Sequence, residues 1–115
     1  MVATKRDSNI GTVVSEEDAW PPPEARVRSA LWQAEGHFER REYFAASSAL
    51  AAVFGLAGED EELVRGLHHL AAAGYRHQTG ESARARRQLA HARSRLADYP
   101  DAMLLVELVE QDVQS

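Results

Sequence analysis

The chain of 115 residues is long enough for one domain, and its 44% apolar and 27% charged residues are typical of a globular protein. It has no cysteine, which excludes disulfides, thiolate zinc sites and cysteine nucleophiles. The first residues lack the apolar run of a signal peptide, and no segment approaches the length of a membrane span. We therefore expect a cytoplasmic protein that does not contact membranes.

Charge is distributed unevenly along the chain, although the formal net charge is only −5. Residues 1–62 carry 6 basic and 12 acidic side chains, whereas residues 63–97 carry 7 arginines and one acid, and residues 98–115 carry five acids and no base. A basic centre between acidic flanks favours either internal pairing or a basic surface patch. Internal pairing is the favoured interpretation, because an acidic chain is a poor match for nucleic acid.

The N-terminal segment, residues 1–23, differs from the rest of the chain. Residues 1–19 are polar, mixed in charge and without period, which predicts a disordered, flexible tail. The three prolines that follow, at positions 21–23, predict a short stiff linker into the first helix. A single domain is therefore expected over residues 24–115.

Two amphipathic segments open this domain. The first predicts a helix over residues 24–40, and the second predicts a helix over residues 42–54 after a tight polar turn. The inward residues of the first helix are expected to be Val27, Leu31, Ala34 and Phe38, which recur at helical spacing.

The third segment, from Glu62 to Thr79, is apolar over most of its circumference. On a helix, Leu63, Leu67, Leu70 and Gly74 fall on one line, with Val64, Ala71 and Tyr75 beside them. Such a helix is normally buried by several neighbours, so we expect it to be the central helix of the bundle. Gly80 is suited to the left-handed position that ends it.

Two more helices are expected after Gly80. The fourth spans about residues 82–97 with Ser82 as its N-cap, and the fifth spans about 102–112 with Asp101 as its N-cap. The fifth is so apolar that it must dock on the bundle or on a partner. No strand pattern is present, and a weak repeat at an offset of 39 residues relates the first two helices to the next two. The sequence therefore predicts an all-α compact bundle of four to five helices, built from two antiparallel helix hairpins.

Two segments resemble a bacterial family called domain of unknown function 309. Phe38-Glu-Arg-Arg-Glu-Tyr-Phe-Ala-Ala-Ser-Ser-Ala-Leu50 resembles the family's opening motif, F-n-x-g-x-Y-f-E-A-H-E-x-L-E. Arg65-Gly-Leu-His-His-Leu-Ala-Ala-Ala-Gly-Tyr-Arg-His-Gln-Thr-Gly80 resembles its continuation, G-L-I-Q-x-A-x-A-x-Y-H-x-x-R-G-N. The resemblance covers about residues 31–97 and implies a compact helical bundle with no established activity.

This chain departs from the family at its polar positions. The family's E-A-H-E-x-L-E cluster falls on residues 45–51, which here read Ala-Ala-Ser-Ser-Ala-Leu-Ala, so every carboxylate and the histidine are missing. The family's glutamine falls on His69, and its Y-H pair on Tyr75 and Arg76. The chain therefore resembles a divergent member that lacks the means for metal or acid–base chemistry at that cluster.

Two sets of polar side chains remain as candidate sites. Arg65, His69, Tyr75 and Arg76 form a possible polar site on the third helix, and Arg84, Arg87 and Arg95 form a possible anion-binding set on the fourth. No metal site is expected, because the adjacent His68 and His69 point 100° apart and no carboxylate lies three or four residues from His69. No cofactor is expected either, since the chain has no glycine-rich phosphate loop.

The favoured hypothesis is a non-enzymatic helical module that acts through protein contacts, or through self-association by the fifth helix or Trp32. A first alternative is nucleic-acid or anion binding by the arginine-rich helix at residues 84–95. A second alternative is a small-molecule or metal-dependent enzyme that uses His69, Tyr75 and His37. The sequence identifies no partner or substrate.

Overall fold

The structure is a computed structural model that describes residues 20–114. The expected flexible segment at residues 1–19 lies outside the described residues. Five α-helices and one short 3-10 helix make up the described part: α2 (Pro23–Glu39), α3 (Tyr43–Ala51), η2 (Gly58–Asp60), α4 (Glu61–Gln78), α5 (Ser82–Leu96) and α6 (Pro100–Gln114).

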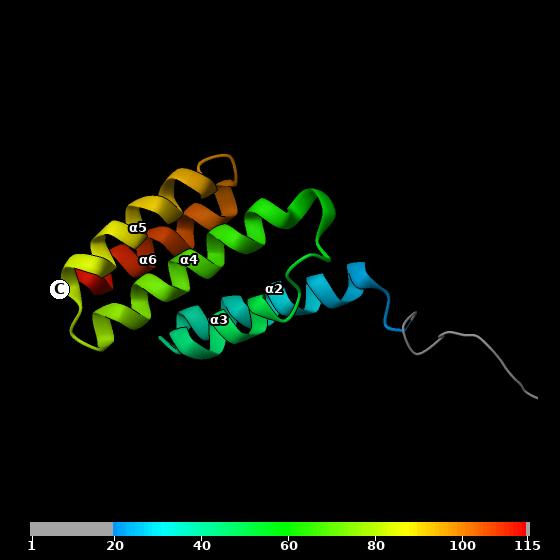
Figure 1. Cartoon of the computed structure of the whole chain (residues 1–115), viewed down its shortest axis with the longest axis horizontal. Helices are drawn as coiled ribbons and strands as arrows, with labels where there is room; N and C mark the ends of the chain where they lie inside the picture. Colours follow the sequence, from blue (N-terminus) through cyan, green and yellow to red (C-terminus); the bar gives the residue numbers. More distant parts are fainter. Residues whose placement is uncertain (1–19, 115) are drawn as a thin grey trace, which may run out of the picture.

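The helices form two antiparallel hairpins and one additional helix (Figure 1). α2 and α3 make the first hairpin, α4 and α5 make the second, and α6 packs against α4 and α5 while also touching α2. Residues 20–114 contain no strand. The predicted all-α bundle of two hairpins is confirmed.

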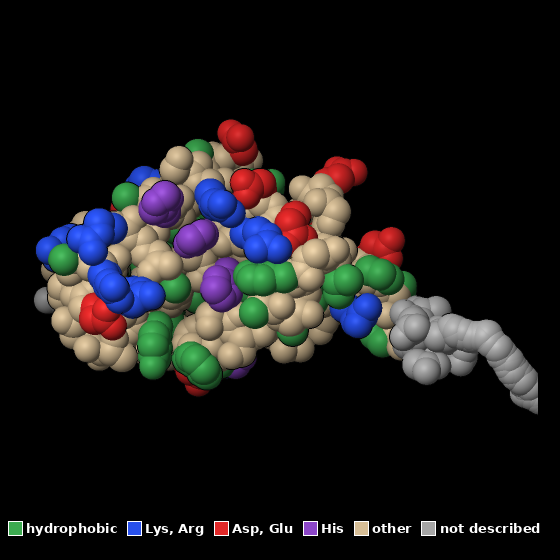
Figure 2. Space-filling view, in the orientation of Figure 1, with side chains coloured by type: hydrophobic (Ala, Val, Ile, Leu, Met, Phe, Trp, Pro, Cys, Tyr) green, Lys and Arg blue, Asp and Glu red, His purple; other side chains and the backbone are tan. Residues whose placement is uncertain are grey.

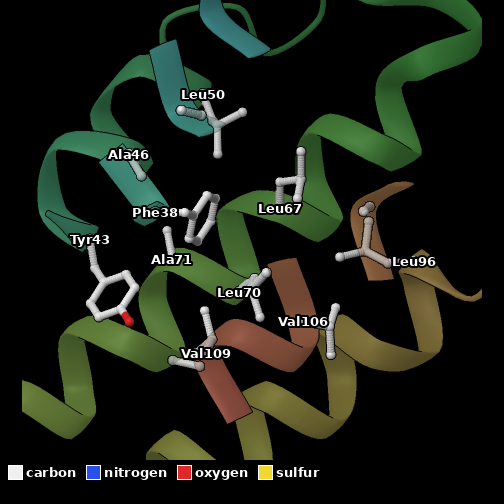
Figure 3. Close-up of a cluster of buried hydrophobic side chains, with 14 of the residues drawn as sticks. Phe38, Tyr43, Ala46, Leu50, Leu67, Leu70, Ala71, Leu96, Val106 and Val109 are labelled. Carbon is white, nitrogen blue, oxygen red and sulfur yellow. The ribbon is translucent and has the colours of Figure 1, made fainter. Parts of the chain in front are cut away.

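α4 is the central helix, since it contacts α3, α5 and α6. Seven of its residues are buried: Val64, Gly66, Leu67, Leu70, Ala71, Ala73 and Gly74. Figure 3 shows part of the resulting core, in which side chains of α2, α3, α4, α5 and α6 converge. The expectation drawn from the apolar circumference of this segment is therefore confirmed.

The inward faces of α5 and α6 follow the helical period. The buried residues are Ala85, Leu89, Ala92 and Leu96 on α5, and Ala102, Val106, Val109 and Val113 on α6. Two of the four buried α5 residues are alanines, whose small side chains allow α5 to pack closely on α4. As expected, α6 covers the bundle with one face, but Leu104 on that helix remains 66% exposed.

The turns that follow α2 and α4 have the same backbone conformation and hydrogen-bond pattern. Gly80 has φ +89°, as predicted, and the next residue, Glu81, donates its N–H to the carbonyl of Arg76 at 2.8 Å. At the end of α2, Arg41 has φ +60° and Glu42 donates its N–H to the carbonyl of His37 at 2.8 Å. Residues other than glycine are uncommon in this left-handed conformation, and the sequence did not predict that Arg41 adopts it.

The predicted boundaries were wrong at the end of α3 and at the start of α6, and the predicted N-cap of α5 was also wrong. α3 ends at Ala51 rather than near residue 54, because Val53 and Phe54 donate to carbonyls only three residues back as the chain tightens towards Gly55. α5 begins at Ser82 itself, with Glu81 in the capping position and no side-chain cap. α6 begins at Pro100, one residue before the expected cap, because a proline at the first helical position needs no N–H partner.

None of the helices formed by residues 20–114 is both long and apolar enough to cross a membrane.

Candidate functional site

A polar pocket lies between α4 and α5 and has a volume of about 230 Å³. Six side chains line it: His69, Arg76, Arg84, Arg87, Gln88 and His91. Arg and His side chains gather over these two helices on the face shown in Figure 2. We call this feature the α4–α5 pocket. Its lining contains nitrogen-bearing side chains and no carboxylate.

The guanidinium of Arg76 is held in a fixed orientation inside the pocket. Its Nε donates to Oε1 of Gln88 at 2.8 Å, and its Nη1 donates to Oε1 of Glu81 at 3.3 Å. Arg84 donates to the same Glu81 oxygen at 3.2 Å. One carboxylate at the edge thus serves two arginines, so the pocket keeps a positive charge.

His69 continues this hydrogen-bonded row. Gln88 Nε2 lies 3.5 Å from His69 Nδ1, and the imidazole of His69 stacks on that of His91 with 6.0 Å between centroids. Burial, followed by the nearby charge of Arg95 and the two neighbouring histidines, lowers the pKa of His69. His69 is therefore neutral at pH 7, and Nδ1 can accept from the Gln88 amide.

The structure divides the two predicted residue sets. It brings His69 and Arg76, from the polar set, together with Arg84 and Arg87, from the anion set. Gln88 and His91 complete the pocket and were not assigned to a site from sequence. Their position on the same stripe of α5 as Arg84 was visible, but the register between α4 and α5 was not.

The other predicted residues lie outside the pocket. Arg65 pairs with Glu61 at 2.9 Å and its guanidinium lies 4.3 Å from the ring centroid of Phe54. Arg95 pairs with Glu62 of α4 at 3.1 Å.

Tyr75 also lies outside the pocket, and its predicted place beside the core was wrong. The side chain is 43% exposed, because its ring packs against Phe44 of α3 at 5.6 Å between centroids instead of entering the interior.

The described part of the chain contains no set of side chains arranged to bind a metal ion. No group of three or more His, Asp or Glu side chains among residues 20–114 could hold an ion. His37, one of the candidate residues for an enzyme, lies in the last turn of α2, where its Nδ1 is 2.7 Å from Glu42 Oε1. It therefore does not line the pocket that contains His69.

A second candidate surface is an apolar groove between α2, α4 and α6, with a volume of about 640 Å³. Its apolar lining residues are Leu31, Leu63, Leu67, Ala102, Leu104, Leu105 and Leu108. Three carboxylates, those of Glu35, Glu39 and Asp101, also line it, and no basic side chain does. We call this feature the α2–α4–α6 groove.

The chain matches no family model, no curated protein and no solved structure. The resemblance to domain of unknown function 309 therefore remains a prediction from the two sequence motifs. The residues that fall on that family's polar cluster lie in α3, where Ala46 and Leu50 are buried. Ser47 there donates to the carbonyl of Phe44 at 3.0 Å, as expected of a hydroxyl within a helix.

Proposed function

We propose that this protein is a non-enzymatic interaction module whose α2–α4–α6 groove binds an amphipathic, cationic helix of a partner protein. The observation that carries the proposal is the groove itself, which has seven apolar lining residues and three carboxylates. Grooves of this kind bind helices that present apolar residues at i, i+3, i+4 and i+7.

The exposed leucine of α6 supports partner binding. Leu104 lines the groove and is 66% exposed, although another face of α6 packs on the bundle. Covering about 100 Å² of such a side chain contributes on the order of 2–3 kcal/mol. A partner helix would supply the apolar cover that the described residues do not.

The charge around the groove selects the chemistry of the partner. A symmetric dimer through this face would place Glu35, Glu39 and Asp101 against the same carboxylates of a second copy. Like charges at an interface are costly, whereas lysines or arginines flanking an apolar stripe would pair with them. We therefore favour a basic partner helix over self-association through α6.

Two helical peptides of about 18 residues test the proposal. Both carry leucines at i, i+3, i+4 and i+7, and the remaining positions are lysine in one and glutamate in the other. We expect fluorescence anisotropy to show binding of the lysine peptide alone, weakened by salt. Equal binding of both peptides, or of neither, would contradict the proposal.

Self-association is the main competing outcome. Sedimentation measurements over a concentration series would detect a dimer. If Leu104→Ser dissociated that dimer, the groove would bind a second copy of this chain and not a helix of another protein. Association that only Trp32→Ser abolishes would instead assign the interface to the exposed face of α2, where Trp32 is 76% exposed.

A further inference from the structure

The α4–α5 pocket is separate from the α2–α4–α6 groove, because the two share no lining residue. Its lining combines three arginines, two imidazoles and one amide, all of which can donate hydrogen bonds. Arginine is over-represented at phosphate-binding sites, because the planar guanidinium can donate two parallel hydrogen bonds to an oxyanion. We infer that the α4–α5 pocket binds the phosphate group of a phosphate monoester.

Hydrogen bonds among the pocket's own side chains hold several of them in place. Glu81, Arg76, Gln88 and His69 form a continuous row of contacts from the edge of the pocket to its interior. Because Gln88 Oε1 accepts from Arg76 Nε, the remaining guanidinium nitrogens keep donors available for a ligand. Little side-chain entropy is then lost when an anion binds.

Arg87 supplies the free cation of the site. It lines the pocket and makes no hydrogen bond or ion pair with any residue in the range 20–114. Arg93 and Arg95 on the same helix are, by contrast, paired with Glu110 and Glu62. Arg84 shares its carboxylate with Arg76, so neither charge is fully neutralised.

Size and surroundings restrict the ligand. A volume of about 230 Å³ lies below the roughly 300–1,000 Å³ of pockets that enclose whole drug-sized ligands. It suits a terminal phosphate whose remaining atoms stay in solvent. No Phe, Tyr or Trp ring lines the pocket, so bases of single-stranded nucleic acid have no such stacking platform there. The monoester is therefore favoured over a nucleic-acid backbone.

Calorimetric titration of the full chain at low salt tests the inference, with inorganic phosphate, O-phosphoserine and a phosphoserine peptide as probes. We expect all three to bind, and the unphosphorylated peptide not to bind. If the peptide binds more tightly than O-phosphoserine, the source is a phosphorylated protein; equal affinity points to a small phosphorylated molecule. No heat from any probe would overturn the inference.

Two arginine variants locate the binding. Arg87→Gln should weaken phosphate binding about tenfold, since one charge-assisted contact is lost. Arg86→Gln is the matched control, because Arg86 is the adjacent exposed arginine of α5 and does not line the pocket. Equal weakening by both variants would overturn the inference in favour of a diffuse positive surface. Tight binding of duplex DNA or RNA, equally sensitive to both variants, would overturn it in favour of a nucleic-acid surface.

Discussion

The ring of Tyr43 on α3 lies directly against the backbone of Gly74 on α4. A Cβ atom at position 74 would lie 2.6 Å from the ring carbons Cγ and Cδ2 of Tyr43. The hydroxyl of the same tyrosine donates to Asp112 Oδ2 of α6 at 2.9 Å. One aromatic side chain thus joins three helices, and it can do so only because position 74 has no side chain.

Gly74→Ala is expected to lower the free energy of unfolding by about 1–3 kcal/mol, because the buried ring must move. The expected gain in helix propensity, at most about 1 kcal/mol, does not offset this strain. Gly36→Ala is the matched control, since its added Cβ would meet only the flexible end of the Arg40 side chain at 3.3 Å. Urea unfolding of both variants checks the difference; two equally stabilising substitutions would show that α3 and α4 do not approach this closely.

Tyr43→Phe tests the bond to Asp112. Removing the hydroxyl should cost about 1 kcal/mol at neutral pH. Burial, together with the hydrogen bond to Asp112, raises the pKa of Tyr43 above its ordinary value of 10.0. The folded protein therefore keeps a proton that the unfolded chain loses, and stability should fall as the pH rises above about 10. Urea unfolding at about pH 9 and about pH 11 should show a smaller fall in the variant.

The surroundings of His68 predict that the protein loses stability at acidic pH. Burial, followed by the charge of Arg65, lowers the pKa of His68, whose ring packs edge-on against Phe54 at 5.0 Å between centroids. The unfolded chain then binds a proton at higher pH than the folded chain does. The contribution of His68 to the free energy of unfolding is therefore fully present above pH 6.5, the ordinary pKa of a histidine. It falls as the pH drops below that value.

The substitution His68→Leu should reduce this acid loss while keeping the apolar contact with Phe54. Unfolding free energies at about pH 7.5 and about pH 5.5 measure it. His69 also has a lowered pKa, so part of the loss should persist in the variant. If the unfolding free energy of the variant fell as much between the two pH values as that of the unsubstituted protein, His68 would not be the source of the acid loss.

Leu104→Ser should weaken binding of the lysine-rich peptide about tenfold without changing the stability of the bundle, because the side chain is mostly exposed. Trp32→Ser provides the control, since Trp32 is 76% exposed and does not line the groove. The same peptide titration, repeated with both variants, separates groove binding from attraction to any exposed apolar residue. A larger effect of the Trp32 substitution would contradict the proposed site.

Helical periodicity was enough to predict the bundle and most inward faces. Ala85, Leu89, Ala92 and Leu96, for example, were placed correctly because helical spacing is a local property of the chain. Helix ends were less predictable, since Ser82 and Asp101 suit a cap chemically but the chain does not use them there.

The binding surfaces depend on contacts between helices, which sequence alone did not supply. His69 and Gln88 are 19 residues apart and meet only because α4 and α5 pack in one particular register. The groove likewise combines Glu35 of α2 with Leu104 of α6, and nothing in either segment indicates the other. The apolar excess of the last helix was visible, but its acidic surroundings were not.

The most direct test of the central claim is a map of backbone amide NMR shifts during titration with the lysine-rich peptide. We predict that the largest changes fall on the lining of the α2–α4–α6 groove, at Leu31, Leu63, Leu105 and their neighbours. Shifts confined to other acidic surfaces, such as Glu59 and Glu107, would show charge attraction without docking and would contradict the account.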